Sequence, residues 1–368
     1  MTQRLPPSLT PLDAALAAVM DGLEPVTPID LPLAEALGCI AAGMAPLAAH
    51  PPRDFAAADG FALRANDLVG ASSYSPVMLP AAPVWVETGD AMPDGCDCVL
   101  DIDAVEASGP ICEALAEGVP GQGVRRAGRD IAAGTSLVAA GSPVTPATLM
   151  LARAAGLDAL RVRRPRLCIV VVPGADEAAQ MIADHARVAG GDTAMVGASG
   201  RNADSIANLF DTTAYDLLLT VGGTGVGRHD AAVTALAARG EVLAHGIALQ
   251  PGRTAAIGMI AGIPAVALPG SPDQAFAVWL ALVRPVLDHL SARQQHQFMT
   301  LPLARKIASG VGIAEIVLLA EEQGGWLPLA VGDLSLQAIA RADAWLLVPG
   351  DSEGFAAGER VDAYLMRE

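Results

Sequence analysis

The sequence predicts an α/β protein of several domains: a doubly wound α/β domain, β-rich domains, and a linker domain of helix and extended chain. The chain has 368 residues, which is longer than one hydrophobic core usually serves. Between residues 166 and 292, apolar runs of strand length alternate with helix-like segments, a pattern typical of a parallel sheet covered on both faces. In residues 46–130 and 293–368, short apolar runs lie between Pro, Gly and Asp turn signals, which indicates small β-rich domains.

Two helices outside the α/β segment belong to the linker domain. The first begins after Thr10 and carries apolar residues at helical spacing as far as Leu23. The second begins after Thr145, and Gly156 ends it. We therefore expect four domains: residues 1–45 with 131–165 as the linker domain, 46–130 as a β-rich domain, 166–292 as the α/β domain, and 293–368 as a C-terminal β domain.

Strands and helices are expected to alternate along the α/β segment. The expected strands are 167–172, 193–196, 217–221 and 265–268, and the expected helices are 178–188, 205–210, 231–238 and 273–290. Sheets of this kind bind ligands beyond the carboxyl ends of their strands. The loops that follow these strands are therefore the places where chemistry is expected.

Composition excludes several classes of protein. Hydrophobic residues make up 52% of the chain and charged residues 17%, so global disorder is excluded. The net charge of −17 argues against nonspecific nucleic-acid binding, which needs a basic surface. No uninterrupted apolar stretch is long enough to span a membrane, and the first residues do not form a secretory signal. We expect a cytoplasmic protein whose five cysteines stay reduced.

The segment VGGTGVGRHD, residues 221–230, is the strongest candidate for a ligand-binding loop. It follows an apolar strand and precedes a helix, so backbone N–H groups and the positive helix end can approach an anion. Asp230 either holds a cation or caps the helix. The candidate anion-binding residues of this loop are Gly222, Gly223, Thr224, Gly225 and Gly227. The alternative is a glycine-rich turn without a ligand.

Three further loops complete the candidate site. PGADE, residues 173–177, offers Asp176 and Glu177, which either help Asp230 to hold Mg²⁺ or complement a helix dipole. Arg253 is the only cation of the other two loops and is a candidate phosphate clamp. The candidate substrate-binding residues of those two loops are Pro251, Gly252, Arg253, Pro269, Gly270, Ser271 and Pro272.

Six motifs occur in the order found in one enzyme family. They are PPRDFAAADGFALRANDL (residues 51–68), TGDAMPDGCDCV (88–99), GRDIAAG (128–134), PGADE, GGTGVGRHD and LPGSP. The chain resembles the molybdopterin molybdenumtransferases, that is, the MoeA family and the equivalent domain of gephyrin, from about residue 11 to residue 368. Two of these motifs, GGTG and LPGSP, also resemble the MogA/MoaB adenylyltransferases, which have a single domain.

The resemblance implies a reaction and a set of residues. Such enzymes insert molybdenum from molybdate into adenylated molybdopterin and release AMP, with a divalent cation such as Mg²⁺. They form homodimers, with the site between the α/β domain of one chain and the β-rich domain of the other. Partners would be the molybdopterin nucleotide and a molybdoenzyme or cofactor chaperone. Carried over by position, the catalytic residues are Asp59, Asp130, Asp176 and Asp230, with Thr88 nearby and Asp176 and Asp230 on the metal.

The chain departs from the family pattern at several charged positions. Gly246, Gln250 and Arg253 occupy the family's lysine positions, and Asn202 occupies the place of an aspartate. Fewer cations weaken the binding of phosphate and molybdate. A carrier or sensor of molybdopterin without turnover is therefore one alternative function, and an adenylyltransferase-like activity is another.

Overall fold

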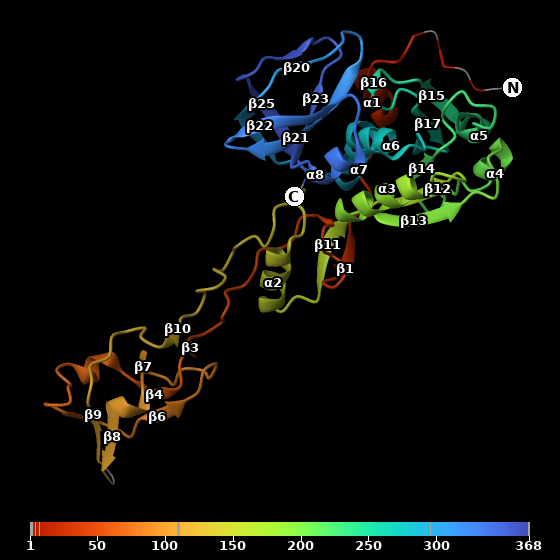
Figure 1. Ribbon diagram of the computed structural model, residues 1–368. Helices are drawn as coiled ribbons and strands as arrows, with labels where there is room; N and C mark the ends of the chain where they lie inside the picture. The colour runs from red at the N-terminus through yellow and green to blue at the C-terminus, as the bar shows by residue number, and fades with distance from the viewer. Residues whose placement is uncertain (1–2, 4, 7, 109–110, 295, 367–368) are drawn as a thin grey trace. The chain divides into compact units, whose positions relative to one another are not determined.

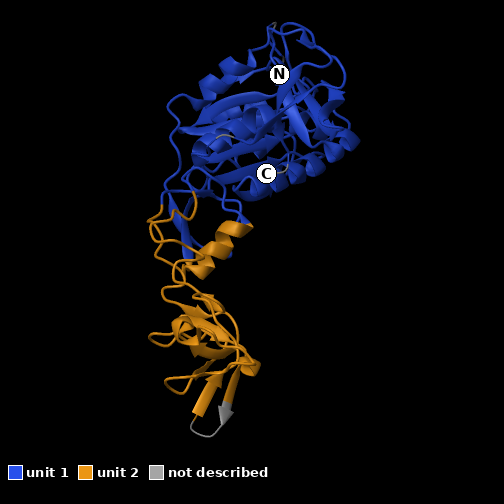
Figure 2. Ribbon diagram, turned by 90° about the vertical axis from the view of Figure 1, so that its left-hand side faces the viewer, with its two compact units in different colours: residues 1–43, 139–145, 159–368 blue, residues 44–138, 146–158 orange. Residues whose placement is uncertain are grey.

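The computed structural model describes residues 3, 5, 6, 8–108, 111–294 and 296–366. The chain forms two compact units (Figure 2). Unit 1 comprises residues 1–43, 139–145 and 159–368, and unit 2 comprises residues 44–138 and 146–158. The finer division into four domains stays a prediction.

A six-stranded sheet with helices on both faces forms the centre of unit 1 (Figure 1). Its strands, in sheet order, are β13 (Asp192–Gly197), β12 (Arg166–Val171), β14 (Leu217–Val221), β18 (Ile263–Leu268), β17 (Ala256–Ile260) and β15 (Glu241–His245). The first four are parallel, as predicted, whereas β17 and β15 run antiparallel to their neighbours. The prediction of a parallel sheet is therefore wrong at β17, which runs opposite to the other five strands.

Alternate residues of the central strands point into two separate cores. On one face Leu167, Ile169 and Leu219 pack with the helices α1, α3 and α6. On the other face Val170 and Leu218 pack with α4 and α5. The helices are α1 (Leu12–Met20), α3 (Asp176–Val188), α4 (Ala203–Ala207), α5 (Ala232–Arg239), α6 (Pro272–Val278) and α7 (Arg284–Ser291). A π-helical segment, Trp279–Val283, joins α6 to α7, so the helix predicted at 273–290 is not uniform.

The rest of unit 1 is largely β-structure. A second six-stranded sheet has the order β16-β21-β23-β25-β19, with β22 paired to β21. Its elements are β16 (Leu249–Gln250), β19 (Phe298–Pro302), β21 (Ala314–Glu322), β22 (Gly325–Val331), β23 (Ala344–Val348) and β25 (Arg360–Leu365), with α8 (Leu336–Arg341) and the paired β20 (Ile307–Ala308) and β24 (Gly354–Phe355). A three-stranded sheet joins β1 (Ile29–Pro32), β11 (Ala159–Arg163) and β2 (Ile40–Ala41).

Unit 2 is β-rich, as predicted for residues 46–130. Three small antiparallel groups of strands form it: β6-β4-β7, β5-β9-β8 and β3-β10. Their bounds are β3 (Phe55–Ala56), β4 (Gly60–Leu63), β5 (Val77–Met78), β6 (Val84–Val86), β7 (Cys98–Leu100), β8 (Val105–Ser108), β9 (Ile111–Ala114) and β10 (Val124–Arg125); the unit also contains the helix α2 (Pro146–Ala154) and two short 3₁₀ helices, Ala65–Leu68 and Ile102–Ala104.

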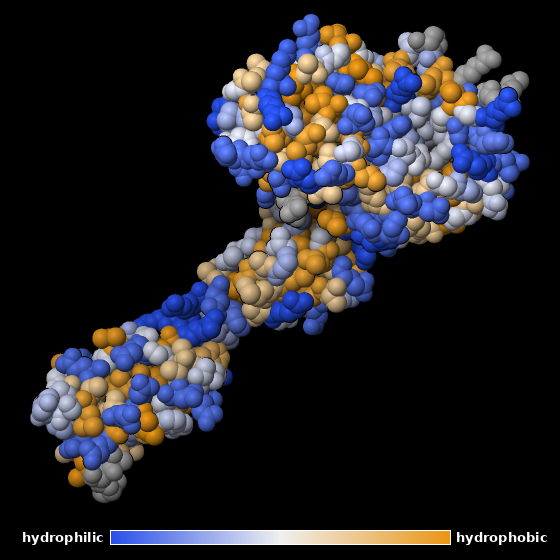
Figure 3. Space-filling view, viewed as in Figure 1, coloured by the Kyte–Doolittle hydropathy of each residue, from blue (hydrophilic) through white to orange (hydrophobic). Residues whose placement is uncertain are grey.

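Among the described residues, no helix has both the length and the apolar character to cross a membrane. On the face shown in Figure 3, apolar residues are interspersed with hydrophilic ones.

Candidate functional site

The carboxyl ends of the parallel strands meet at one edge of the central sheet, where the loops that follow them line a cavity. Its volume is about 290 Å³. The lining comprises residues 172–175 after β12, 222–225 after β14 and 269–271 after β18, together with Arg201, Asp230, Thr254 and Gln274. Three of the predicted loops therefore meet at one cavity.

Glycines allow these three loops to pack against one another. A Cβ atom on Gly222 would lie 3.0 Å from the Cβ atom of Ala175 and 3.1 Å from that of Val172. A Cβ atom on Gly270 would lie 3.2 Å from the Cα atom of Gly222. Larger residues at either position would separate the loops, so the glycines determine the shape of the cavity wall.

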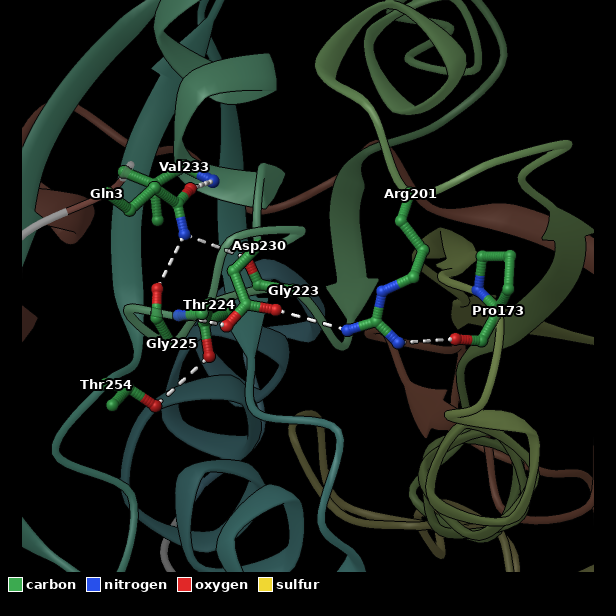
Figure 4. Close-up of polar contacts among 10 residues, drawn as sticks. Gln3, Pro173, Arg201, Gly223, Thr224, Gly225, Asp230, Val233 and Thr254 are labelled. Atoms are coloured by element: carbon green, nitrogen blue, oxygen red, sulfur yellow. Dashed lines mark hydrogen bonds and ion pairs between the residues drawn. The ribbon is translucent and has the colours of Figure 1, made fainter. Parts of the chain in front are cut away.

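Arg201 and Asp230 form an ion pair in this wall (Figure 4). Arg201 donates one hydrogen bond to a carboxylate oxygen of Asp230 at 3.2 Å and another to the Pro173 carbonyl at 3.0 Å. The other carboxylate oxygen of Asp230 accepts from the Gly227 N–H at 2.9 Å. The Asp230 side chain is 17% exposed and that of Arg201 45%. The guanidinium therefore connects two loops and places a positive charge at the cavity.

Arg201 was not among the predicted site residues. It lies in the polar run SGRNAD between β13 and α4, which has the composition of a turn. The usable signal was its place after a strand of the parallel sheet, since a cation there reaches the ligand edge. Arg253, the predicted clamp, is exposed and does not belong to the residues that line the cavity.

Thr224 is buried in the glycine-rich loop. Its hydroxyl is 3.1 Å from the hydroxyl of Thr254, and both residues line the cavity. The Nε2 atom of His245 lies 3.2 Å from the Thr224 carbonyl oxygen. The sequence predicted Thr224 as a donor to an anion, and the pair of hydroxyls at the cavity is compatible with that role.

The N-terminus of α5 does not contribute free N–H groups to the cavity. The N–H of Ala232 donates to the Gly223 carbonyl at 3.0 Å. The N–H groups of Val233 and Thr234 donate to the Gln3 side-chain oxygen at 2.9 and 3.3 Å. Protein acceptors already occupy these donors, so they are not available to hydrogen-bond an anion. That the positive end of this helix helps to bind an anion stays a prediction.

Several predicted residues of unit 1 do not belong to the lining of the cavity, although Ser271 does. Those outside the lining include Asp176, Glu177, Pro251, Gly252, Arg253 and Pro272. Asp176 and Glu177 are exposed in the first turn of α3, where their charges complement the helix dipole. Pro272 begins α6, and the Ser271 hydroxyl donates to the Asp273 carboxylate. The predicted residues of the loop after β16 are either buried, as Pro251 and Gly252 are, or exposed, as Arg253 is.

The described residues hold no preformed metal centre. Nowhere in the described parts of the chain do three or more His, Cys, Asp or Glu side chains gather closely enough to hold a metal ion. A magnesium site on Asp176 and Asp230 stays a prediction, and it would depend on oxygens from the substrate and from water.

The two predicted acids of unit 2 are each held by a donor. Asp59 accepts hydrogen bonds from the Thr88 N–H at 2.7 Å and from its hydroxyl at 2.9 Å, and these bonds lower the pKa of Asp59. Asp130 accepts from Nε of Arg125 at 2.7 Å, which lowers the pKa of Asp130. Both groups are therefore carboxylates at neutral pH and cannot serve there as proton donors.

Comparisons with known proteins agree with this architecture. The MoeA N-terminal region, domains I and II, matches residues 10–156, and a probable molybdopterin-binding domain matches residues 166–289. Molybdopterin molybdenumtransferase 2 of Mycobacterium tuberculosis is 32% identical over 304 residues, which cover 71% of this chain and 74% of the relative. The molybdopterin molybdenumtransferase of Synechococcus elongatus is 27% identical over 361 residues, covering 85% and 88% of the two chains.

A solved structure extends the likeness over the whole fold. The crystal structure of the molybdopterin biosynthesis MoeA protein from Pyrococcus horikoshii has a TM-score of 0.72 and 25% identity, and the match covers 97% of this chain and 99% of that one. With the two domain matches and a relative 32% identical over most of both chains, this chain belongs to the molybdopterin molybdenumtransferase (MoeA) family.

Proposed function

We propose that this protein inserts molybdenum into adenylated molybdopterin and releases AMP. The observation that carries the proposal is the cavity at the carboxyl edge of the central sheet, where glycine loops meet Arg201 and Asp230. Such loops let phosphate groups approach the backbone closely, and an arginine holds phosphate with directed hydrogen bonds. Family membership supports the same chemistry.

Arg201 is the residue we assign to the phosphate groups of the substrate. A local positive charge is needed, because the net charge of −17 otherwise repels an anion. Arg201 lines the cavity, whereas Gly246 and Gln250 carry no charge where the family has lysines. Asp230 holds the guanidinium in place and stays available to the reacting groups.

A magnesium ion at Asp230 would be bound largely by oxygens of the substrate. Mg²⁺ in proteins is commonly bound through one or two carboxylates together with phosphate oxygens and water. Asp230 and Asp176 would supply the carboxylates. The ion would neutralise charge on the phosphoanhydride as it is cleaved. Arg201 pairs with the same Asp230 carboxylate, so phosphate oxygens of the substrate would have to supply the remaining negative charge beside the ion.

The acids of unit 2 act in the proposal as charged acceptors. Asp59 and Asp130 have lowered pKa values, so each can orient water or a cationic group but cannot deliver a proton near neutral pH.

We further propose a cytoplasmic homodimer that passes its product to a molybdoenzyme or a cofactor chaperone. Sedimentation analysis of the full chain tests the homodimer, since a monomer at working concentration would contradict it.

The deciding experiment is AMP release by the purified protein supplied with adenylated molybdopterin, molybdate and Mg²⁺. Release that depends on molybdate supports the insertase. Formation of adenylated molybdopterin from ATP and molybdopterin would instead favour an adenylyltransferase activity.

A second candidate is a carrier or sensor that binds molybdopterin without turnover. The observation that favours it is the small number of cations at the cavity: among the described lining residues, Arg201 is the only arginine or lysine. Tight binding of molybdopterin without AMP release would support this function.

A further inference from the structure

The side chain of Gln3 is buried against the glycine-rich loop and uses both ends of its amide (Figure 4). Its nitrogen donates to the carbonyl oxygens of Gly223 at 3.0 Å and Gly225 at 2.9 Å. Its oxygen accepts from the first turn of α5, as described above. One side chain near the start of the chain thus joins the loop to the helix that follows it.

The N-terminal segment, by which we mean the described residues 3, 5, 6 and 8–10, is itself attached beside this loop. The Thr10 N–H donates to the Gly246 carbonyl at 2.9 Å, and the Ala248 N–H donates to the Thr10 carbonyl at 2.7 Å. Leu9 and Pro6 also lie close to Gly246, because a Cβ atom on this glycine would be 3.1 Å from a side-chain carbon of each. Gly246 has a φ of +87°, which side-chain-bearing residues rarely adopt.

The N-terminal segment lies against a position where the chain departs from its family pattern. Gly246 occupies a position where the family resemblance implies lysine. A side chain there would meet Leu9 and Pro6. The glycine and the N-terminal segment are therefore matched to each other.

The contact of Gln3 with the glycine-rich loop helps to hold three successive carbonyl groups of that loop. Gln3 binds the carbonyls of Gly223 and Gly225, and His245 lies at hydrogen-bond distance from the carbonyl of Thr224 between them. Neither Gln3 nor His245 lines the cavity. Three successive carbonyl oxygens are thus held by side chains outside the lining. If these carbonyl oxygens could rotate toward the cavity, they would repel a phosphate group.

We propose that Gln3 is a positioning residue for phosphate binding, and that the N-terminal segment is a strap that fixes the glycine-rich loop. The proposal rests on the proposed function for its ligand. Gln3 acts through the loop and does not touch the substrate. Its loss removes the side-chain donor of the Gly225 carbonyl and leaves the Gly223 carbonyl with the Ala232 N–H alone. The loop then gains freedom that ligand binding must remove.

Two variants separate positioning of the loop from simple capping of α5. Gln3→Ala removes every contact of the amide. Gln3→Glu keeps an acceptor for the Val233 and Thr234 N–H groups, and its charge suits a helix N-terminus, but it cannot donate to the loop carbonyls. Gln180→Ala is the matched control, since Gln180 is an exposed glutamine of α3 whose amide nitrogen donates to Asp184, four residues along the same helix.

The experiment measures AMP affinity by calorimetry and amide hydrogen exchange at residues 222–227 in the full chain. We expect both Gln3 variants to raise the dissociation constant for AMP about tenfold, with faster exchange in the loop. In turnover assays the effect should fall on KM rather than on kcat. Gln180→Ala should match the wild type in each measurement.

Two results would overturn the strap. One is wild-type affinity and exchange in Gln3→Glu, because capping of α5 alone would then explain the contact. The other is tighter AMP binding in Gln3→Ala, which would make the segment a competitor of the ligand. If the wild-type protein does not bind AMP, the proposed function fails, and the exchange measurement decides the strap alone: unchanged exchange in both variants refutes it.

Discussion

The carboxylate at the glycine-loop cavity of unit 1 and the two carboxylates of unit 2 are held by different kinds of contact. Asp230 belongs to a network in which Arg201 joins two loops, and Gln3 fixes the same glycine-rich loop from 220 residues away. Asp59 and Asp130 each rest on one neighbouring residue, Thr88 and Arg125.

This difference predicts that ligand binding and reactivity depend on different residues in the two units. A network that joins loops determines the shape of a cavity, so changes within it act on ligand affinity as well as on chemistry. An exposed carboxylate with one donor residue keeps its charge when the shape of the cavity changes. Variants in the two units should therefore differ in which kinetic constant they change, and the predictions below test that separation.

The largest effect is expected for Asp230→Asn. The amide keeps an acceptor for the Gly227 N–H but loses the charge that Mg²⁺ and Arg201 require. We expect AMP release to fall about 100-fold, as for the loss of a metal-associated carboxylate, with a smaller loss of AMP affinity because Arg201 loses its ionic partner. Steady-state AMP release and calorimetry measure the two quantities.

Asp216→Asn is the control for this variant. Asp216 also pairs with an arginine, Arg166, but at the opposite end of β14. Wild-type turnover in Asp230→Asn would remove this residue from the mechanism and erase the contrast between the units.

The parts of the fold that depend on local pattern could be predicted from the sequence. Continuous apolar runs identified β12, β14 and β18, and a parallel sheet places their loops at one edge. The strands β15 and β17 were missed, because Gly258 interrupts one run and the other is short and ends in polar residues. The reversed direction of β17 depends on tertiary pairing that no local pattern encodes.

The site was predicted where it depends on glycines and missed where it depends on distant contacts. The glycine-rich loop and Asp230 follow a strand, so their place in the fold could be inferred. Nothing near Gln3 in the sequence indicates a partner 220 residues away. Arg253 was predicted because it is the only cation of two candidate loops, but charge at a site depends on where a side chain reaches in the folded chain.

Arg201→Gln should weaken anion binding about tenfold, which is the typical range for losing one charged hydrogen-bond donor. Arg253→Gln should leave it unchanged, because Arg253 is outside the cavity lining. Calorimetry with AMP and with molybdate at two salt concentrations measures both effects. The reverse pattern, with Arg253→Gln the weaker binder, would return the anion site to the loop after β16.

Gly246→Ala should produce a smaller loss of affinity, about threefold, by displacing the N-terminal segment from the loop. Gly262→Ala is its matched control, since Gly262 has a φ of +82° and no atom within 4 Å of an added Cβ atom. Both variants carry the strain of a positive φ, but only the first meets Leu9 and Pro6. Equal effects of the two on loop exchange would show that backbone strain, and not the strap, is responsible.

The smallest effect is expected for Thr88→Val, which tests the unit 2 side of the comparison. The variant removes the hydroxyl donor and keeps the N–H donor, so the pKa of Asp59 should rise part of the way back toward its usual value of 3.8. Asp59 stays ionised at neutral pH, and AMP affinity should not change. Carbon-detected NMR titration of the Asp59 carboxyl group measures the shift.

The sign of the stability effect follows from the lowered pKa. A carboxylate whose pKa is lowered by folding stabilises the folded state above its unfolded pKa, and this contribution is lost as the pH falls through the folded value. Thr88→Val should therefore be slightly less stable than the wild type at neutral pH, with the difference fading below the unfolded value of 3.8. Thr213→Val removes the same kind of hydroxyl from Asp211 in unit 1, outside the cavity lining. A change in turnover shared by both variants would reflect general destabilisation, whereas a change confined to Thr88→Val would tie Asp59 to the reaction.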